Sequence, residues 1–262
     1  MLRKRIIFSL IYSDGFFMQS RNFRLQRVGD LRWLERNYQF QRIAFSLDEL
    51  IVINATRGEK SIQTFAAMIS ELVNEVFIPL TAGGGIRTIQ DAELLFNNGA
   101  DKILINSILI ENPELVTDLI KKYGSQSLVA SIDYKYLNGR NIIFINDGSR
   151  SIDMSIEQYI EYLETLNIGE IYLNSIDKDG TGFGYDFDLI NQLSGNISKP
   201  LIIAGGAGNE KHLLEGLHIP GVSAVATANL FNFIGDGLPK ARKRIIESEV
   251  NLAVWLDEYT LK

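Results

Sequence analysis

The chain has 262 residues, of which 46% are hydrophobic and 22% are charged, and it contains no cysteine. The absence of cysteine excludes a disulfide scaffold, a zinc ribbon and a cysteine nucleophile. The net charge of −6, from 26 basic and 32 acidic residues, gives no basic footprint for nucleic acid. No apolar run approaches the roughly 20 residues needed to cross a bilayer. The sequence therefore predicts a soluble cytoplasmic protein, with neither nucleic acid nor membrane among its partners.

Eight short apolar runs follow one another along the chain at nearly regular spacing. Each run is continuously apolar, which is typical of strands buried on both faces of a parallel sheet. The first run follows a basic start but lacks a signal-peptide cleavage site, so we expect a strand there as well. The predicted strands are Arg5–Ile11, Glu49–Asn54, Ile78–Ala82, Lys102–Asn106, Leu128–Asp133, Glu170–Asn174, Pro200–Ala204 and Ala224–Thr227.

Amphipathic segments, with apolar residues three and four positions apart, lie between most of these strands. The predicted helices are Ile62–Val76, Thr88–Phe96, Glu114–Lys122, Ile156–Leu166 and Glu210–Leu217. Strand followed by helix, eight times over about 250 residues, predicts a (β/α)8 TIM barrel. A doubly wound sheet is the alternative, but it needs no eighth strand and breaks more often into two domains. We expect a single domain over residues 1–262, with a short hairpin inserted after the fifth strand, in Asn141–Ile145 and the polar stretch Asn146–Ser155.

An internal repeat supports the barrel. The segment Thr81–Arg87 (TAGGGIR) resembles Ile203–Asn209 (IAGGAGN), about half the chain further on. Arg5–Gly15 can likewise be laid over Ser127–Gly139. Two half-barrels of four βα units each account for both coincidences.

Candidate site residues lie where the predicted strands end, because barrel active sites occupy that face. Two glycine-rich loops, Gly83–Gly85 and Gly205–Gly206, each open a helix there, and a helix start presents free N–H groups to anions. Two such loops at matching positions predict one ligand with a phosphate at each end; the alternative is that the glycines form only tight turns. The acidic loop Asp177–Gly184 fits a ligand contact and a solvated Asx-turn equally well. The polar candidates at the strand ends are Asn54, Asn106, Asp133, Asn174, Asp177, Asp179 and Thr227.

Six motifs carry a resemblance to a known family: LRKRIIFSL, PLTAGGGIRTIQDAELLFNNGADKILINS, ENPEL, YGSQSLVASID, GEIYLNSIDKDGTGFGYD and PLIIAGGAGNEKHLLEG. Over nearly its whole length the chain resembles the cyclase subunit of imidazole glycerol phosphate synthase, the HisF branch of the HisA/HisF barrels. The resemblance implies a substrate with two phosphates. One phosphate would lie at Gly83, Gly84, Gly85 and Asn106, and the other at Gly205, Gly206 and Thr227.

The chain departs from that family where cyclisation takes place. The family uses two aspartates, one at the end of strand one and one at the end of strand five. The strand-five aspartate is Asp133, but Ile11 occupies the strand-one position. Gln19 stands where the family has a lysine, and Asn54 replaces a further acidic residue. Since isoleucine carries no exchangeable proton, general acid–base catalysis across the pocket would lose one partner. Asp14 does not replace the lost aspartate, because it belongs to an Asp-Gly turn that the family already has.

The opposite mouth of the barrel matches the family. There the family closes the barrel floor with a salt-bridged gate of two basic and two acidic residues, and a glutaminase docks beneath it and feeds ammonia through the barrel. The residues at the four gate positions are of the family's types, and Asp101 matches a position that faces the glutaminase. The implied gate is Arg5, Glu49, Lys102 and Glu170.

Together these features predict a paralogue of the cyclase subunit that receives ammonia from a HisH-like glutaminase but does not perform histidine-pathway cyclisation. The resemblance supplies a role: support for converting an acetamido group to an acetamidino group on a bacterial surface-polysaccharide sugar, together with an amidotransferase-like third protein. The ligand would be a phosphorylated small molecule, with no cofactor and no metal. Two alternatives stay open: a genuine cyclase in which Asp133 acts alone or with Asp177, and a non-catalytic allosteric scaffold for the glutaminase.

Overall fold

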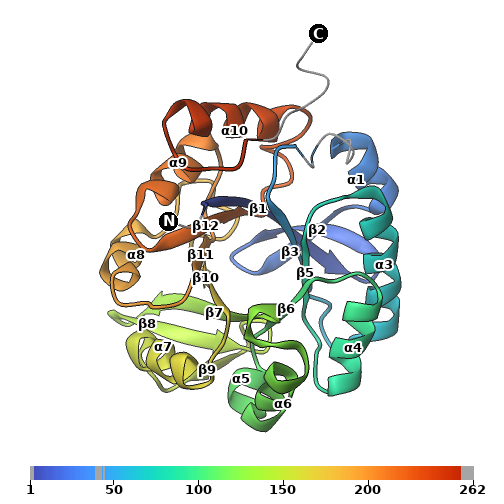
Figure 1. Cartoon of the computed structure of the whole chain (residues 1–262), viewed down its shortest axis with the longest axis vertical. Coiled ribbons are helices and arrows are strands. Elements are labelled where there is room, and N and C mark those ends of the chain that lie inside the picture. The colour runs from blue at the N-terminus through green and yellow to red at the C-terminus, as the bar shows by residue number, and fades with distance from the viewer. Residues whose placement is uncertain (1–2, 39–42, 44, 255–262) are drawn as a thin grey trace.

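Eight parallel strands close into a barrel in the computed structural model, which describes residues 3–38, 43 and 45–254 (Figure 1). The ends of the predicted domain, residues 1–2 and 255–262, lie outside the described residues. Each barrel strand pairs in parallel with the next, and the last pairs with the first, which confirms the predicted (β/α)8 barrel. In barrel order the strands are β1 (Arg5–Ser13), β4 (Glu49–Asn54), β5 (Leu80–Gly83), β6 (Lys102–Ile105), β7 (Leu128–Leu137), β10 (Glu170–Ser175), β11 (Leu201–Ala204) and β12 (Val222–Thr227).

The predicted strands are all present, with small shifts at their ends. β5 and β11 each begin one residue after a proline, Pro79 and Pro200, because proline has no N–H to donate to the sheet. The carbonyl oxygens of both prolines still accept hydrogen bonds, from Leu50 and Ile171. β1 and β7 run past their predicted ends because each continues into an antiparallel hairpin.

Two hairpins extend the barrel on the face where the strands end. β2 (Phe16–Arg21) and β3 (Arg24–Gly29) continue from β1, whereas β8 (Arg140–Ile145) and β9 (Arg150–Ile152) continue from β7. The second hairpin was expected and the first was not. Since β1 and β7 open the two half-barrels, the hairpins repeat the internal symmetry predicted from the sequence.

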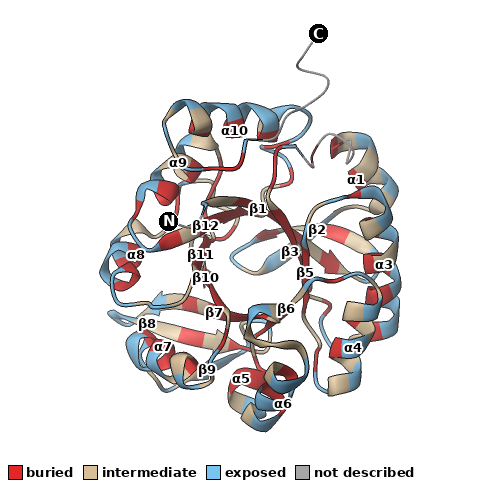
Figure 2. Cartoon of the chain, in the orientation of Figure 1, coloured by how far each residue is buried: buried red, intermediate tan, exposed pale blue. Residues whose placement is uncertain are grey.

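Helices surround the barrel and turn their apolar sides towards it (Figure 2). The five predicted helices are present, and four more were missed: α1, α5, α8 and α10. Helix α5 has only four residues, and α10 reads GLPKARKRIIE, in which basic residues separate the apolar ones and an arginine, Arg242, is buried. The described helices are α1 (Leu31–Tyr38), α3 (Ile62–Glu75), α4 (Ile89–Asn97), α5 (Ile108–Glu111), α6 (Pro113–Tyr123), α7 (Ile156–Thr165), α8 (Phe187–Ser194), α9 (Glu210–His218), α10 (Gly237–Glu247) and the 3-10 turn η1 (Ser125–Ser127). None of these helices has the length and hydropathy that crossing a bilayer requires.

The core has two layers. The larger one fills the space between the strands and the helices, with residues such as Phe8, Phe65 and Leu173. The smaller one fills the barrel itself and includes Ile7 and Tyr172. Strand residues alternate between these layers because successive side chains point to opposite faces. Along each strand, the inward-facing residues nearest the strand start lie at one mouth of the barrel, and those nearest the strand end lie at the other. The candidate site is built from the inward-facing residues at the strand ends.

Candidate functional site

A cavity of about 500 Å³ opens at the mouth where the barrel strands end. Its wall includes strand-end residues from both half-barrels, among them Ile11, Asn106, Asp133 and Asn174. The tips of both hairpins also contribute to the wall, through residues such as Phe23 and Asp147. A cavity of this size and position is suited to a small organic ligand.

Asp133 lies in this wall with its carboxylate held between two amides. Asn174 Nδ2 donates to Asp133 Oδ1 at 2.8 Å, and Asn106 Nδ2 donates to Asp133 Oδ2 at 3.3 Å. Burial raises the pKa of Asp133 to about 7, aided by the negative charges of Asp147 and Asp179 and opposed by the Asn174 hydrogen bond. A carboxyl group with this pKa can both give and take a proton near neutral pH.

The wall across from Asp133 is apolar. β1 and β7 are separated by three strands on either side of the closed barrel, so Ile11 and Asp133 come from opposite sides. Ile11 pairs with Ile53 in the neighbouring strand, and both residues line the cavity. A carboxylate at position 11 would face Asp133 across the cavity, whereas the isoleucine leaves Asp133 without an acid–base partner on that strand.

Most of the predicted site residues come together at the cavity. Asn106, Asp133, Asn174, Asp179, Gly84, Gly85, Gly205, Gly206 and Thr227 all line it. Gly83, Asn54 and Asp177 are described but do not line it. The side chain of Asn54 is buried and accepts a hydrogen bond from Thr56 N at 3.1 Å, and Asp177 Oδ2 accepts one from Tyr136 N at 2.7 Å.

The acidic loop holds the first hairpin in place. Asp179 is buried and accepts hydrogen bonds from Ser20 Oγ at 2.5 Å and from Phe23 N at 3.0 Å. Asn22 Nδ2 donates to the carbonyl oxygens of Ile176 and Asp177. Burial raises the pKa of Asp179, although both of its hydrogen bonds favour the carboxylate. The start of the loop therefore packs against the hairpin and is not a free turn, and Asp179 and Gly180 line the cavity. Further along, Phe183 is 83% exposed.

The two glycine loops have the same backbone shape. The sequence repeat pairs Gly83 with Gly205, but the backbone shifts this match by one residue, to an interval of 121 positions. Gly84 and Gly205 have φ angles of 91° and 85°, and Gly85 and Gly206 have 92° and 110°. A Cβ on Gly84 would lie 2.2 Å from Asn54 O, and one on Gly206 would lie 2.0 Å from Gly184 O. The left-handed backbone and this close packing require glycine at both loops whether or not a phosphate binds.

Three cationic side chains at the cavity were missed from the sequence. Lys60 Nζ donates to Asn54 O at 2.9 Å and forms an ion pair with Asp147 at 2.8 Å. Arg87 donates to Asn146 Oδ1 at 3.2 Å, and Arg57 donates to Phe23 O at 2.9 Å. The available signal was their position: Arg57 and Lys60 follow the second barrel strand, and Arg87 follows the Gly83–Gly85 loop.

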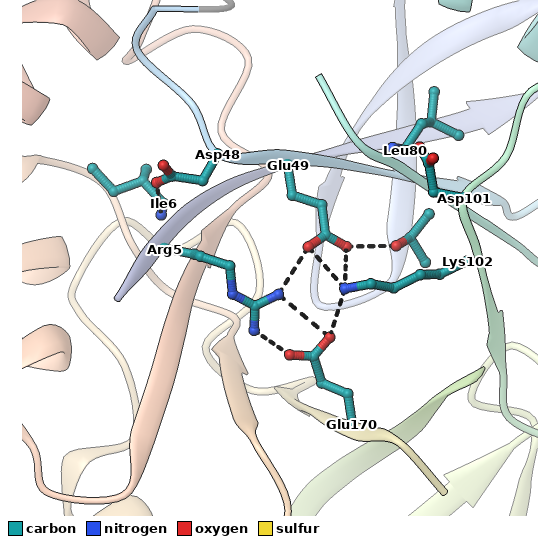
Figure 3. Close-up of polar contacts among 9 residues, drawn as sticks. Arg5, Ile6, Asp48, Glu49, Leu80, Asp101, Lys102 and Glu170 are labelled. Carbon is teal, nitrogen blue, oxygen red and sulfur yellow. Dashed lines mark hydrogen bonds and ion pairs between the residues drawn. The ribbon is translucent and has the colours of Figure 1, made fainter. Parts of the chain in front are cut away.

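The four charged residues of the predicted gate form a ring at the opposite mouth (Figure 3). Arg5 contacts Glu49 at 2.9 Å and also pairs with Glu170, while Lys102 contacts Glu49 at 3.1 Å and Glu170 at 3.0 Å. Each cation therefore touches both anions. The two glutamates are almost fully buried, with side chains 3% and 8% exposed, and the two cations are just over 20% exposed. The ring is thus a closed, partly dry layer of alternating charge.

Two further residues belong to this floor. Thr81 is fully buried and its Oγ1 donates to Glu49 Oε1 at 2.6 Å, so β5 also contributes to the ring. Asp101 lies beside Lys102 and accepts a hydrogen bond from Leu80 N at 2.8 Å through Oδ2 (Figure 3). Asp48, which precedes Glu49, accepts one from Ile6 N in the same way. These aspartates fix the strand starts that carry the ring, a role that the sequence did not indicate.

Comparison with known proteins agrees with this geometry. A sequence profile of the family described as "Histidine biosynthesis protein" matches residues 28–235. The chain belongs to this family. It is 48% identical over 256 residues to a protein of Parasynechococcus marenigrum that bears the provisional name imidazole glycerol phosphate synthase subunit hisF2, covering 97% of this chain and 95% of that protein.

Other relatives in the family are named as the imidazole glycerol phosphate synthase subunit HisF. One from a Hydrogenobaculum species is 34% identical over 256 residues, covering 97% of this chain and all of the relative. One from Chlorobaculum tepidum is 33% identical over 253 residues, covering 96% of this chain and 99% of the relative. The chain is therefore a HisF-like barrel along nearly its whole length.

Proposed function

We propose that this HisF-like barrel receives ammonia from a HisH-like glutaminase at the ring end and delivers it to a reaction other than histidine-pathway cyclisation. One observation carries the proposal: the ring of Arg5, Glu49, Lys102 and Glu170 is complete, whereas Ile11 faces Asp133 at the other mouth. Removal of one partner from a buried ion pair typically destabilises a protein by 3–5 kcal/mol. Loss of any one of the four partly buried charges would therefore lower the stability of the fold, and this chain has all four.

The glutaminase is the partner that such a floor fits. The two cations of the ring are its more exposed members, and Asp101 lies at the same end of the barrel. Ammonia released beneath the floor would pass the ring and enter a barrel interior of apolar side chains such as Ile7, Ile51 and Val129. A neutral ammonia molecule crosses such a layer more readily than ammonium, because an isolated charge is strongly disfavoured in an apolar environment.

At the cavity, Asp133 is the residue that we assign to proton transfer. Its raised pKa leaves it partly protonated near neutral pH, and the amides of Asn106 and Asn174 hold its carboxylate in one orientation. We assign Gly84, Gly85, Gly205, Gly206 and Thr227 to binding a phosphorylated small molecule. Gly83, Asn54 and Asp177 stay candidates only through the loops they shape, since these residues do not line the cavity.

The reaction that we propose is the conversion of an acetamido group to an acetamidino group on a bacterial surface-polysaccharide sugar. Ammonia attacks the amide carbon and a C–N bond forms. The C–O bond then breaks and the amide oxygen leaves as water, which takes up the two protons that the incoming nitrogen loses. We assign activation of that oxygen to an amidotransferase-like third protein at the cavity mouth, and delivery of ammonia to this barrel. The name hisF2 of the 48% identical relative marks it as a second protein of the HisF type, which supports a paralogue but names no sugar.

A genuine cyclase is the second candidate, and Asp133 favours it. Asp177 is a poor acid–base partner for Asp133, because its carboxylate is bound to Tyr136 N and lies outside the cavity wall. An allosteric scaffold without chemistry is the third candidate. A cavity of about 500 Å³ that keeps a carboxyl group with a pKa of about 7 argues against it, since a scaffold needs neither.

The experiment that tests the proposal substitutes Lys102 by Ala in the complex with the glutaminase. Formation of the acetamidino product is measured twice, once with glutamine and once with an ammonium salt as the nitrogen source. We expect a larger loss with glutamine, because only glutamine-derived ammonia must pass the ring. Thr81→Val is the matched control, since it removes a hydrogen bond to Glu49 and leaves all four charges in place. Equal losses with both nitrogen sources in the Lys102 variant would mean that the ring is structural.

A further inference from the structure

The cavity is symmetric in its backbone. The glycine loops after β5 and β11 have matching φ angles, and the helices that follow are capped at matching positions, by Thr88 for α4 and Asn209 for α9. In each loop the N–H of the residue before the cap is not free: Arg87 N donates to Asp91, and Gly208 N donates to His212 Nδ1. The backbone alone therefore gives neither end a greater attraction for an anion.

The side chains break this symmetry. Every lysine and arginine among the described residues of the cavity wall comes from the first half-barrel: Arg57, Lys60 and Arg87. A lysine lies against each loop, because a Cβ on Gly85 would be 3.3 Å from the Lys60 side chain and one on Gly206 would be 3.0 Å from Lys178 Cβ. Of the two, only Lys60 lines the cavity. Its ammonium group is mostly buried and pairs with Asp147, whereas Arg57 and Arg87 are exposed and hold only neutral acceptors.

The other end of the cavity is neutral or acidic. Thr181 stands 121 positions after Lys60, and Gly208 stands at the same interval after Arg87, so neither cation is repeated in the sequence. Lys178 takes the place of Lys60 beside the second loop, but it brings no charge to the cavity wall. The polar wall residues there are Gln19, Thr227 and Asn229, which are uncharged, together with the acidic Asp179. Lys178, at the position matching Arg57, is described but does not line the cavity.

We propose that the cavity takes a ligand whose negative charges are gathered beside Gly84 and Gly85, as in a diphosphate ester, and whose other end is uncharged and polar. Guanidinium and ammonium groups bind phosphate oxygens through charge-assisted hydrogen bonds, and two adjacent phosphates use three such groups better than one does. The amides and hydroxyls of the second end suit sugar hydroxyl or acetamido groups. This inference rests on the proposed function for the role of the ligand, and it narrows the class of phosphorylated substrate to one charged at a single end.

The test measures binding directly and needs neither the glutaminase nor a reaction. Calorimetry on the purified chain compares pyrophosphate with inorganic phosphate, and fructose 1,6-bisphosphate with fructose 6-phosphate. We expect pyrophosphate to bind about ten-fold more tightly than phosphate, and the bisphosphate to bind no more tightly than the monophosphate. Lys60→Thr, which copies the matching position of the second half, and Arg87→Gln should each weaken pyrophosphate binding about ten-fold. Lys178→Gln is the matched control and should change it less than about two-fold.

Two outcomes would overturn the inference. The first is a bisphosphate that binds ten-fold more tightly than the monophosphate, which would place a phosphate at each end. The second is an equal loss of pyrophosphate affinity in the Lys60, Arg87 and Lys178 variants, which would mean a general effect of surface charge. Arg87 forms no ion pair among the described residues, so its variant stays informative if Lys60→Thr unfolds. The two proposals can fail separately. If pyrophosphate binds as expected but Lys102→Ala lowers product formation equally with glutamine and with ammonium, the proposed function is refuted and this inference stands.

Discussion

Replacement of Asp133 by asparagine should stabilise the protein at alkaline pH. Burial raises the pKa of this carboxyl from 3.8 to about 7, so the folded protein holds the proton more tightly than the unfolded chain. Below pH 4 both states are protonated and the group costs nothing. As the pH rises from about 4 to 7 the unfolded chain ionises first, and the folded state loses stability until both are ionised.

The size of the effect follows from the shift. About three pKa units correspond to about 4 kcal/mol at pH 8, at about 1.4 kcal/mol for each unit. An asparagine offers one acceptor where the carboxylate offers two, so one amide of Asn106 or Asn174 loses its partner, which costs about 1–2 kcal/mol. We therefore expect a net gain of about 2–3 kcal/mol at pH 8, or about 5–10 °C in melting temperature for a chain of this size. Near pH 5 the gain should vanish, because the remaining ionisation penalty only balances the lost hydrogen bond.

The assay is thermal unfolding followed by circular dichroism at pH 5 and pH 8, at one scan rate. Asp153→Asn is the control, since the side chain of Asp153 is 98% exposed and lies just after β9. It should change the melting temperature by the same small amount at both values of pH. An Asp133 variant that is destabilised equally at pH 5 and pH 8 would refute the assignment of a raised pKa to Asp133. A gain at pH 8 in the Asp153 variant would show that net charge is the cause.

Three further predictions follow from the site and the floor. In an ammonia-dependent assay the wild-type chain should cyclise the family's phosphoribulosyl-formimino carboxamide ribotide substrate about 10²–10⁴-fold more slowly than an ordinary cyclase, because Ile11 lacks a transferable proton; a normal rate, or rescue of a histidine auxotroph, would contradict this. Thr81→Val should lower the free energy of unfolding by about 1–3 kcal/mol, measured by urea titration, because a buried charged oxygen of Glu49 loses its shorter hydrogen bond and keeps only Lys102 Nζ at 3.3 Å. Gly206→Ala should destabilise the chain by more than about 1 kcal/mol, because its φ is 110° and a Cβ meets Gly184 O, whereas Gly195→Ala has open space and a φ of −73° and should be neutral.

The barrel was predictable because its strands are short, continuous apolar runs in a regular rhythm with the helices. That signal is weaker in two of the missed helices. Helix α1 buries only Leu34 and Tyr38. Helix α10 buries a face at helical spacing, but this face includes Arg242, which pairs with Asp48 and which residue type alone would place on the surface. The hairpin β2–β3 was missed for another reason. Its strands are polar on their exposed sides, and what holds the hairpin down is the buried carboxylate of Asp179, 150 residues and more away along the chain.

The glycine loops show the limit of sequence patterns at the site itself. Their left-handed φ angles and the backbone oxygens beside Gly84 and Gly206 already require glycine, so the motif alone cannot separate a phosphate site from a tight turn. What distinguishes the two loops is not in either motif. Arg57, Lys60 and Arg87 line the cavity beside the first loop, whereas Lys178, which lies beside Gly206, does not line it. The repeat conserved the backbone frame, and ligand choice rests on residues that the repeat does not share. For this reason substitution at Lys60, and not at either glycine, is the change that can alter binding without altering the loop.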